Sequence, residues 1–545
     1  MDKLIYFDNY EDLDKNMSDS NIGARRKRNI KDHLLIIYGV INSVLRGGED
    51  CVDIQIYDLQ KAFDALWLHD CLNDIYDTLP EHKRNDEISL LYESSKVNLV
   101  AVKTGFGLTD RVNIPNIVQQ GGTWGSMLCS NSLDTLGKKC RDRGEHCYLY
   151  KKTSRILPLA FVDDLNGISR CGMESLSLNT FINTQIELKK LQFHVPDSKG
   201  KTKCHKLHIG KNRGMCPTLK VHGTIMPEVT EDTYLGDILS SDGKNTKNVK
   251  NRISKGLGTM NQIFSLLENI CFGPHYFEIA ILLRESMLIN GTLTNAEIWY
   301  NFTESEIEEF EALDRLFFRR LLQVPVSTPC ESYYLEMGVL PISVLIKARR
   351  ANYLQSILKQ SKTGMLFSFF STQWHNPCKG DWTEQVKDDL ADLNIPYTLE
   401  IIEKKSKETF KIIVKAKAKE LALTNLLSKK ESHSKLDNIT YRELKMQEYF
   451  QSDKFSIEQK LTIFRCRVRM ERFGENFRGG NVAVMCPLCK LHLDNQAMGY
   501  QCPEIKKEME VKGCIEDMYK EEIKLETVRT MTKILEIRKT KQENE

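Results

Sequence analysis

The sequence predicts an α+β protein in which a sheet in the first half of the chain is followed by a long helical region. Apolar and polar residues alternate along VDIQI (52–56), which is the period-2 pattern of a half-buried strand. A second apolar run, 156–169, contains an acidic pair and is typical of a β-hairpin. After SSDGKN (240–245), apolar residues recur at intervals of three and four, which indicates helices from about residue 243.

Three aspartates are placed so that the sheet would bring them together. Asp58 ends the first strand, and Asp163 and Asp164 lie within the hairpin. Adjacent carboxylates in an apolar run repel each other and are costly to desolvate unless a cation neutralises them. An Asp-Asp pair alone is most often a turn, but this one follows YDLQKAFD (57–64) and QGGTWGSMLCS (120–130) in that order. The combination predicts a site for two Mg²⁺ ions of the kind that catalyses nucleotidyl transfer.

Taken in series, these motifs resemble the reverse transcriptase region of a non-LTR (LINE-type) retrotransposon. SNIGARRKRNIKDHL (20–34) is similar to a fingers motif of that family and YDLQKAFD to its first palm motif. QGGTWGSMLCS resembles the motif behind the nucleotide pocket, and AFVDD (160–164) the catalytic hairpin. Two later palm segments are similar to KLQFHVPDSKGKTKCHKLHIGK (190–211) and YLGDILSSDGKN (234–245). The resemblance covers about 20–345 and returns at CPLC (486–489).

The resemblance implies a right-hand polymerase with a mostly helical C-terminal region. Its parts would be an N-terminal segment with partial fingers (1–49), a palm with an antiparallel sheet (50–242), a helical thumb (243–345), a helical basic connector (346–480), a zinc-knuckle-like motif (481–510) and a charged helical tail (511–545). Residues 1–19 are acidic and polar, so we expect them to be poorly ordered. Nothing corresponds to the family's endonuclease, so we expect a larger element protein to supply it.

The resemblance also implies roles for the acidic residues. Asp58 and Asp163 would bind two Mg²⁺ ions, one activating the primer 3′-hydroxyl and the other steadying the leaving pyrophosphate. Asp164 would support the site. The implied activity is that of an RNA-directed DNA polymerase, which extends a DNA primer on an RNA template with deoxynucleoside triphosphates.

Four further residues carry roles in nucleotide handling by the same resemblance. Phe63 would lie under the incoming sugar and exclude a 2′-hydroxyl. Gln120 and Gly121 would lie against the template base and the nucleotide, where a missing Cβ permits close approach. Lys203 would protonate or neutralise pyrophosphate; its alternative is a solvated lysine in the basic run KGKTKCHK (199–206).

Three groups of basic side chains are candidates for contacts with RNA or DNA phosphates. The first, before an apolar helix-like stretch, has a nuclear import signal and a solvated loop as its alternatives. The other two have helical spacing, and solvated helix faces are their alternative. The groups are Arg25, Arg26, Lys27 and Arg28; Lys407, Lys411, Lys415 and Lys419; and Arg465, Arg469 and Arg472.

A zinc site is the remaining candidate. CPLCKLHLDNQAMGYQC (486–502) resembles the family's zinc knuckle and offers Cys486, Cys489 and Cys502 as ligands. The position of the family's histidine holds Met498, and a thioether is a poor zinc ligand. His492 is a substitute, with Cys514 a more distant one. A zinc-binding knuckle and a knuckle without metal both stay open.

Composition agrees with these interpretations without deciding among them. The net charge is +3 with 28% charged residues, so basic clusters matter more than the sum. The 16 cysteines lack the regular spacing of a disulfide scaffold, which favours a reduced intracellular protein. No apolar run reaches the ~18 residues of a membrane span. A nuclear location fits synthesis primed on chromosomal DNA.

Two other functions stay open at this point. One is a catalytically inactive retroelement remnant that still binds RNA or DNA through its helical regions. The other is a viral-type RNA polymerase, which shares the logic of the palm. Phe63 and the FVDD sequence (161–164), in place of a Gly-Asp-Asp hairpin, argue against the latter.

Overall fold

The protein forms two compact units, each drawn from separated parts of the chain. The computed structural model describes residues 2–47, 51–95, 99–113, 118, 124–194, 203–211, 217–269, 273–396, 398–476 and 484–543. The first unit contains Met1–Asn245, Ile298–Asn301 and Ser356–Gln385, and the second contains Thr246–Glu297, Phe302–Gln355 and Val386–Glu545. All the named strands of the described residues lie in the first unit, so the predicted α+β class is confirmed.

A five-stranded sheet is the framework of the first unit. Its strand order is β13-β10-β1-β9-β8, where β13 is Glu228–Val229, β10 His205–Ile209, β1 Val52–Tyr57, β9 Asp164–Arg170 and β8 Leu159–Phe161. The neighbours are antiparallel except for β10 and β13, which are parallel, so the sheet is mixed rather than antiparallel throughout as predicted. Every residue of β1 is buried, which corrects the prediction of a half-buried strand.

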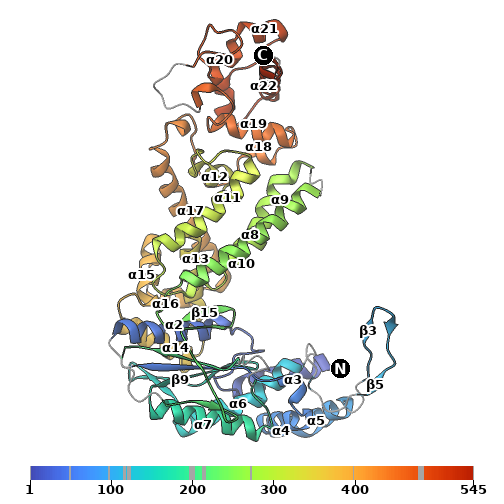
Figure 1. Ribbon diagram of the computed structural model, residues 1–545, viewed down its shortest axis with the longest axis vertical. Helices are drawn as coiled ribbons and strands as arrows, with labels where there is room; N and C mark the ends of the chain where they lie inside the picture. Colours follow the sequence, from blue (N-terminus) through green and yellow to red (C-terminus); the bar gives the residue numbers. More distant parts are fainter. Residues whose placement is uncertain are drawn as a thin grey trace. The chain divides into compact units, whose positions relative to one another are not determined.

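Helices cover both faces of this sheet, which explains why β1 is fully buried. Figure 1 shows α7 (Met173–Leu188) below the sheet and α2 (Ile30–Gly47) above it. On the α7 side, the Gln55 side chain donates to Ser175 Oγ at 3.0 Å. A Cβ added to Gly167 would lie 3.0 Å from Leu178, so the missing side chain lets α7 approach β9 closely. Gln55 of β1 is therefore buried under α7 and hydrogen-bonded to it.

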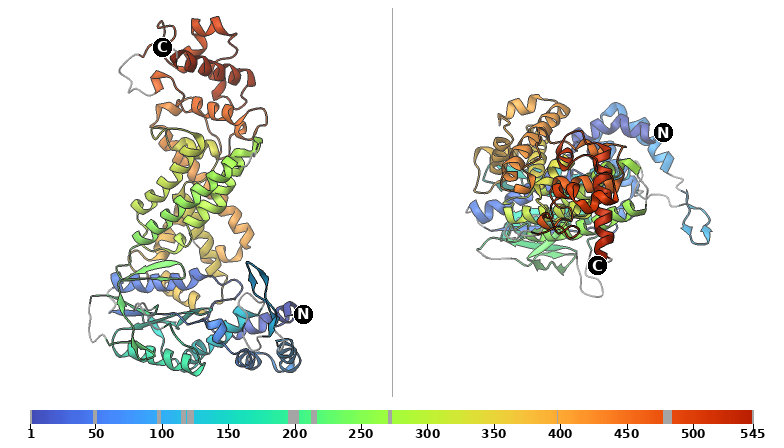
Figure 2. Two further views of the ribbon diagram at one scale, coloured as in Figure 1. Left: turned by 45° about the vertical axis from the view of Figure 1, so that its right-hand side comes forward. Right: turned by 90° about the horizontal axis from the view of Figure 1, so that it is seen from above.

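The other elements of the first unit are short strands and helices around the sheet. The helices are α1 (Asp2–Asn16), α3 (Ala62–Ala65), α4 (Leu68–Thr78), α5 (Glu81–Ser95), α6 (Gly125–Arg143) and α14 (Met365–His375). The strands are β2 (Leu99–Val100), β3 (Lys103–Thr104), β4 (Gly107–Leu108), β5 (Val112–Asn113), β6 (Tyr148–Tyr150), β7 (Ser154–Ile156), β11 (Lys220–Val221), β12 (Thr224–Ile225), β14 (Glu231–Tyr234) and β15 (Asp237–Ser240). The ribbon of β2 to β5 stands apart from the helices around it in both figures, and Phe106 at its tip is fully exposed (Figures 1 and 2).

The N-terminal segment is an ordered helix, which corrects the expectation of poor order for residues 1–19. Tyr10, Leu13 and Met17 are buried at spacings of three and four along and just after α1. The Arg26 guanidinium lies 4.4 Å from the Tyr10 ring centroid, at cation–π distance. The apolar stripe of α1 is short and interrupted by acidic residues, so the composition of residues 1–19 did not indicate a helix.

A segment far along the chain completes the first unit. Phe369 of α14 packs where Gly39 has no side chain, since an added Cβ would lie 2.3 Å from its ring. The buried Asp381 accepts hydrogen bonds from Asn42 at 2.7 Å and from Lys151 at 3.2 Å. Residues 356–385, which the sequence analysis placed in a connector, thus belong to the sheet-bearing unit.

The second unit is helical in its described residues. Its elements are α8 (Thr246–Asn269), α9 (Tyr276–Leu283), a π-helical turn (Arg284–Ile289), α10 (Asn290–Thr292), α11 (Glu304–Leu322), α12 (Glu331–Met337), α16 (Leu399–Lys404), α17 (Lys407–Lys430), α18 (Glu448–Gln451), α19 (Ile457–Arg467), α20 (Gln496–Gln501), α21 (Pro503–Glu508) and α22 (Leu525–Glu543). Helices α13 (Ile342–Leu358) and α15 (Trp382–Asp392) run from one unit into the other along the chain. No helix in the described ranges is long and apolar enough to cross a membrane.

Helix α8 has the apolar stripe that its sequence predicts, with one displacement. Val249, Met260 and Ile263 are buried as expected. Leu257 of the predicted stripe is exposed, whereas Gly256 meets Leu313 of α11, to which an added Cβ would lie at 2.7 Å. The close approach of α11 therefore selects the small residue for the contact and turns the neighbouring leucine outward.

A buried ionic cluster ties α12, α18 and α19 together. The fully buried Glu336 accepts from Arg467 Nε at 2.9 Å and from the hydroxyl of Tyr449 at 2.8 Å. The hydroxyl of Tyr441 also donates to this carboxylate. Removing one partner of such a pair leaves an uncompensated charge, which costs about 3–5 kcal/mol.

Candidate active site

The fold brings Asp58, Asp163 and Asp164 to one end of the central sheet. Asp58 directly follows β1, and β1 pairs with β9 so that Tyr57 faces Leu165. The β8–β9 hairpin pairs Phe161 with Asp164 and leaves Val162 and Asp163 as its two-residue turn. Antiparallel pairing of β1 with β9 therefore sets the end of β1 beside the turn of the hairpin. The strand, the acidic hairpin and the order of the motifs around them predicted this arrangement.

The hairpin turn holds a strained backbone. Val162 has φ 61°, a left-handed conformation that β-branched residues rarely adopt. Strain of this kind persists only where the surroundings enforce it. Here the Asn21 side chain encloses the turn, because its Nδ2 donates to the Val162 carbonyl and its Oδ1 accepts from the Val162 N–H, both at 3.3 Å.

Residues 20–23 make further contacts with β8 and its turn. Backbone hydrogen bonds join Ile22 N–H to the Ala160 carbonyl at 3.1 Å and Ala160 N–H to the Ser20 carbonyl at 2.8 Å. A Cβ added to Gly23 would lie 2.4 Å from the Val162 nitrogen. The SNIG residues (20–23) thus form a brace on the edge of β8, a role that sequence reasoning missed although it singled out the motif.

The three carboxylates repel one another electrostatically. Burial, together with the charges of Asp163 and Asp58, raises the pKa of Asp164 to about 6, although Lys203 lowers it. Burial and the Asp58 charge also raise the pKa of Asp163, against a lowering hydrogen bond from its own backbone. The site therefore favours a positive charge among the three groups.

A lysine and a histidine from the segment after the hairpin face Asp58. Lys203 Nζ lies 3.3 Å from Asp58 Oδ2, and His194 Nε2 lies 3.5 Å from the same oxygen. The His194 N–H donates to the Asp58 carbonyl at 2.9 Å, which fixes the backbone of the acid. Lys203 was predicted for the site, whereas His194 was not singled out, although it lies in the quoted segment 190–211.

These residues fit the Mg²⁺ that the family resemblance implies. Three carboxylates supply hard oxygen ligands, which Mg²⁺ prefers. Oδ2 of Asp58 accepts no hydrogen bond, and its contacts with Lys203 and His194 are longer ion-pair distances of 3.3 and 3.5 Å, so a divalent cation would compete with these two side chains for it. Two anions with raised pKa values beside it would be neutralised by a divalent cation.

The residues expected to contact the nucleotide are described only in part. Phe63 lies on α3, which follows Asp58 closely along the chain, and its side chain is half-buried. Gln120 and Gly121, predicted to lie against the template base and the nucleotide, are outside the described residues.

The first basic cluster is largely engaged within the protein. Arg25 is bonded to Asp14 at 2.7 Å with only 5% of its side chain exposed. Arg28 pairs with Asp19 at 2.5 Å. Arg26 covers the Tyr10 ring, and Lys27 is exposed with φ 64°. Lys27 and the exposed edge of Arg26 are thus the parts of this cluster open to a phosphate.

The arginine cluster near the cysteine motif is not on one helix, contrary to its predicted spacing. Helix α19 ends at Arg467, and Arg469 follows with φ 49°. The Met470 N–H donates to the Arg465 carbonyl at 2.7 Å, which is the closing bond of a left-handed helix cap. Arg472, beyond the cap, is exposed. A neighbouring arginine, Arg467, is instead buried and bonded to Glu336. The sequence analysis did not single it out.

Three cysteines of the C-terminal motif converge, but its histidine does not join them. The sulfurs of Cys486, Cys489 and Cys502 lie within 4.8 Å of one another. Burial raises the pKa of Cys489, but hydrogen bonds from the backbone of Leu491 and His492 and from the other two thiols leave it lowered on balance. Within the described chain, neither His492 nor Cys514 belongs to this group of potential ligands. The donor set is therefore three thiols with a fourth position open.

The tail beyond this motif is packed rather than free. Val528, Met531 and Ile534 of α22 are fully buried, and α22 packs against α19. Arg538 of α22 lies 3.9 Å from Cys486 Sγ and 2.8 Å from Asp494. The mixed charge of this segment predicted a charged tail. In the structure these charges lie on the outer face of α22 and in the ion pair between Arg538 and Asp494.

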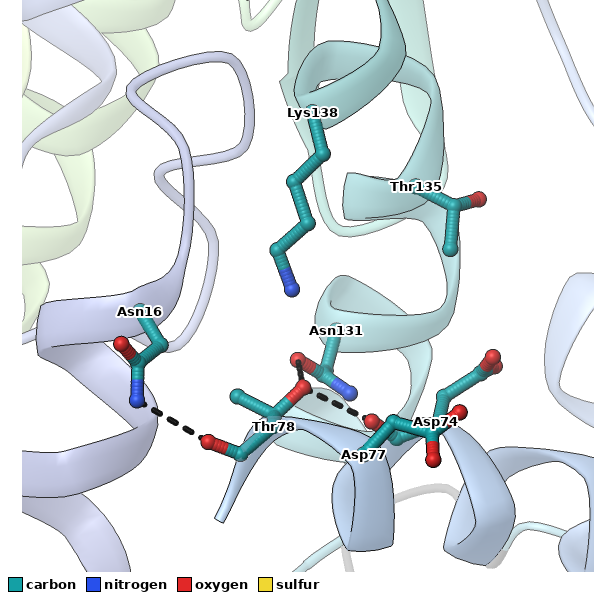
Figure 3. A pocket seen from close by; sticks show the side chains of 7 residues that line it. All are labelled: Asn16, Asp74, Asp77, Thr78, Asn131, Thr135 and Lys138. Atoms are coloured by element: carbon teal, nitrogen blue, oxygen red, sulfur yellow. Dashed lines mark hydrogen bonds between the residues drawn. The ribbon is translucent and has the colours of Figure 1, made fainter. Parts of the chain in front are cut away.

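A polar pocket of about 370 Å³ lies elsewhere in the first unit, between α1, α4 and α6 (Figure 3). Asn16 donates to the Thr78 carbonyl at 2.9 Å, and the Thr78 hydroxyl donates to the Asp74 carbonyl at 2.7 Å. Lys138 and Asn131 line it from α6. None of the three aspartates of the candidate site lines this pocket.

No family model matches the chain, and no curated protein matches it. Among solved structures, it is similar to Candida tropicalis telomerase in complex with a fragment of telomeric RNA, with 12% identity over 76% of this chain and a TM-score of 0.32. The apo form is similar over 75% of this chain at 12% identity and TM-score 0.31. The form truncated from its C-terminal domain is similar over 44% at 12% identity and TM-score 0.30.

The chain spans 56%, 61% and 44% of the length of these telomerase chains, respectively. At these TM-scores the likeness carries no argument about function.

Proposed function

We propose that the chain is an RNA-directed DNA polymerase of the non-LTR retrotransposon type. The observation that carries the proposal is the convergence of Asp58, Asp163 and Asp164 where β1 ends beside a strained hairpin turn. Its substrates would be an RNA template, a DNA primer or target DNA, and deoxynucleoside triphosphates. The family resemblance of the motifs around these acids supports the choice of substrates.

Asp58 and Asp163 would hold two Mg²⁺ ions, with Asp164 supporting them. When bound, such a pair of ions stabilises the attacking and leaving oxygens of an in-line displacement. Asn21 and the residues beside it fix the turn that carries Asp163. Lys203, which lies 3.3 Å from Asp58, would neutralise the leaving pyrophosphate or give it a proton.

Phe63, Gln120 and Gly121 would form the nucleotide pocket, with Phe63 excluding a ribose 2′-hydroxyl. Nucleic-acid phosphates would be contacted by Arg26 and Lys27, by the α17 lysines and by Arg472. The three converging thiols would bind Zn²⁺ in the C-terminal motif. A nuclear location and a larger element protein that supplies the endonuclease belong to the same proposal.

Primer extension on an RNA template tests the assignment. We expect the wild-type chain to extend a DNA primer with Mg²⁺ and deoxynucleotides, and Asp163→Asn to lower the rate by about 10²–10³-fold, the order of one lost electrostatic contact at the reacting atoms. Asp64→Asn is the matched control, because Asp64 is an exposed acid on α3. It should keep full activity.

Binding of the primer-template, measured in parallel, separates the alternatives. Asp163→Asn should bind it as the wild type does. Extension by Asp163→Asn at the wild-type rate would refute the site. Salt-sensitive binding without extension by the wild type would instead identify an inactive remnant that binds nucleic acid. Equal incorporation of ribonucleotides would point to an RNA polymerase.

A further inference from the structure

The opposite end of β1 gathers a second set of metal-ligating side chains. Asp53 is paired with His208 on β10 and with Ser169 on β9. Cys51 lies two residues before Asp53, and Cys171 lies two residues after Ser169. Because side chains alternate between the faces of a sheet, Cys51, Asp53, Cys171 and His208 share one face.

Cys51, Cys171 and His208 have the spacing of ligands around one ion, and Asp53 lies beside them. The thiols of Cys51 and Cys171 and the His208 imidazole lie within 4.8 Å of one another. Cys171 Sγ is 3.5 Å from both Asp53 Oδ1 and His208 Nδ1, and Asp53 Oδ1 is 2.9 Å from His208 Nδ1. Ligands bound tetrahedrally at about 2.0–2.3 Å are about 3.3–3.8 Å apart, so small side-chain movements would complete the site.

Cys51, Asp53 and His208 are buried, Cys171 is partly exposed, and two polar atoms of the cluster lack partners. Asp53 is 0% exposed and His208 8%. The buried Oδ2 of Asp53 and Nε2 of His208 have no hydrogen-bond partner. An acid held in an apolar interior without full partners is unfavourable, and a bound cation removes that penalty. The unpaired atoms therefore point to a ligand beyond the hydrogen bonds within the cluster.

This cluster is separate from the three aspartates of the candidate site. Asp53 and Asp58 lie near opposite ends of β1. Five residues of extended strand span about 17 Å. The donors also differ in kind, since thiols and imidazole select Zn²⁺ over Mg²⁺.

We propose that Cys51, Asp53, Cys171 and His208 bind one structural Zn²⁺ ion that fastens β1, β9 and β10 together. Two cysteine thiols release their protons to solvent on binding, and the neutral imidazole and the carboxylate complete a four-ligand set. A site closed by four protein ligands has no position for a substrate, so its role is to stabilise the sheet. The inference does not depend on polymerase activity.

Metal analysis of the full-length chain tests the site. The C-terminal thiols are removed first with Cys486→Ser and Cys489→Ser, so that any remaining zinc belongs to the sheet. We expect this background to retain one equivalent of zinc, and Cys171→Ser added to it to retain none. Cys147→Ser is the matched control, since Cys147 is also a partly exposed cysteine but belongs to neither cluster of ligands. It should keep the metal.

A second pair of variants separates metal binding from packing. His208→Cys supplies another ligand and should retain zinc, whereas His208→Phe fills the space without one and should lose it. Replacement of zinc by Co²⁺ in the background should give the charge-transfer absorption of a cobalt–thiolate bond. Absence of zinc and of this absorption in the folded background would overturn the proposal. A Cys51–Cys171 disulfide, seen as the loss of two hydrogens in the intact mass, would do the same.

Discussion

At the scale of single residues, the two acids of the hairpin turn are held in different ways. Asp163 lies in the turn itself and has its own backbone as a hydrogen-bond donor, whereas Asp164 begins β9 and meets the charges of both other aspartates. The folded protein therefore resists ionisation of Asp164 more than the unfolded chain does. This difference makes stability depend on pH.

Asp164→Asn should stabilise the metal-free protein at neutral pH. The pKa of Asp164 is raised from 3.8 to about 6, so the folded state binds the proton more tightly and loses stability as pH rises through this window. We expect the variant to melt a few degrees above the wild type at pH 8 and closer to it at pH 5, where each kcal/mol shifts Tm by about 2–4 °C. Thermal melting at both pH values measures this.

Mg²⁺ and a second variant provide the controls. Added Mg²⁺ should raise the melting temperature of the wild type and reduce the gap to Asp164→Asn, because the cation supplies the missing counter-charge. Asp64→Asn, which removes an exposed acid, should show no such pH-dependent gain. An equal gain by Asp164→Asn at pH 5 and pH 8 would contradict the electrostatic explanation.

We expect Asn21 to be a positioning residue for the turn that carries Asp163. Asn21→Ala removes the hydrogen bonds to both backbone groups of Val162 and should let the strained turn relax. A displacement of about 1 Å at reacting groups can cost about 10²-fold in rate, so we expect kcat to fall by that order. Steady-state primer extension measures kcat and KM separately. An unchanged kcat, or a loss confined to KM, would assign Asn21 a structural role only.

At the scale of elements, α17 presents one apolar and one basic face. Phe410, Val414 and Ala418 are buried at intervals of four, and the exposed lysines 407, 411 and 415 repeat with the same interval on another face. The sequence predicted this stripe correctly as helical. If these lysines contact phosphates, they release counterions on binding, so the salt dependence of binding tests the contact.

Replacing Lys407, Lys411 and Lys415 with Gln should weaken primer-template binding and flatten its dependence on salt. Each lysine that neutralises a phosphate contributes about 0.7–0.9 to the slope of log K against log salt concentration. The slope should therefore fall by about 2. Fluorescence anisotropy across a salt series measures it. Lys404→Gln, in the neighbouring α16, is the control, and an unchanged slope in the triple variant would leave the stripe solvated.

Elements were predictable where the signal was local. Strand β1 and the hairpin followed from alternation and an acid pair, and α8 from its apolar period. The fully buried state of β1 did not follow, because it depends on helices from both sides. Helix α1 was missed since its stripe is diluted by acids, and the end of α19 was missed since Arg469 takes a conformation usual for glycine.

The site shows the same division. Asp58, Asp163 and Asp164 were predictable because each lies next to a recognisable strand. The hold of Asn21 on Val162 and the grouping of Cys51 with Cys171 and His208 depend on register between distant strands, which one sequence does not reveal. Lys203 was placed by resemblance, and its ion pair with Asp58 is a finding of the structure.

At the scale of the whole molecule, the sheet-bearing unit depends on a late segment of the chain. Leu366, Phe369 and Phe370 of α14 are buried, and Asp381 is bonded to Asn42 and Lys151. All the polymerase-like motifs before the C-terminal cysteines nevertheless precede this segment. The motifs of the first unit therefore end before residue 345, whereas the unit itself is complete only at residue 385.

A chain ending at residue 345 should be unstable although it contains every motif that resembles a polymerase palm. Loss of 356–385 exposes the α2 surface around Gly39, and a single large buried side chain such as Phe369 is worth about 3–5 kcal/mol. Limited proteolysis should cut this chain rapidly and spare one ending at residue 396. Equal resistance of the two chains would show that the first unit folds without α14.

Because the first unit combines distant parts of the chain, it cannot be completed until its last segment has been synthesised. Residue 245 leaves the ribosome long before residue 385, and at about 5–20 residues per second the interval is on the order of 10 s. Throughout that interval the α2 surface that α14 will cover is without its partner. The nascent chain must therefore wait, with an apolar face open to chaperones, for a helix that has not yet been translated.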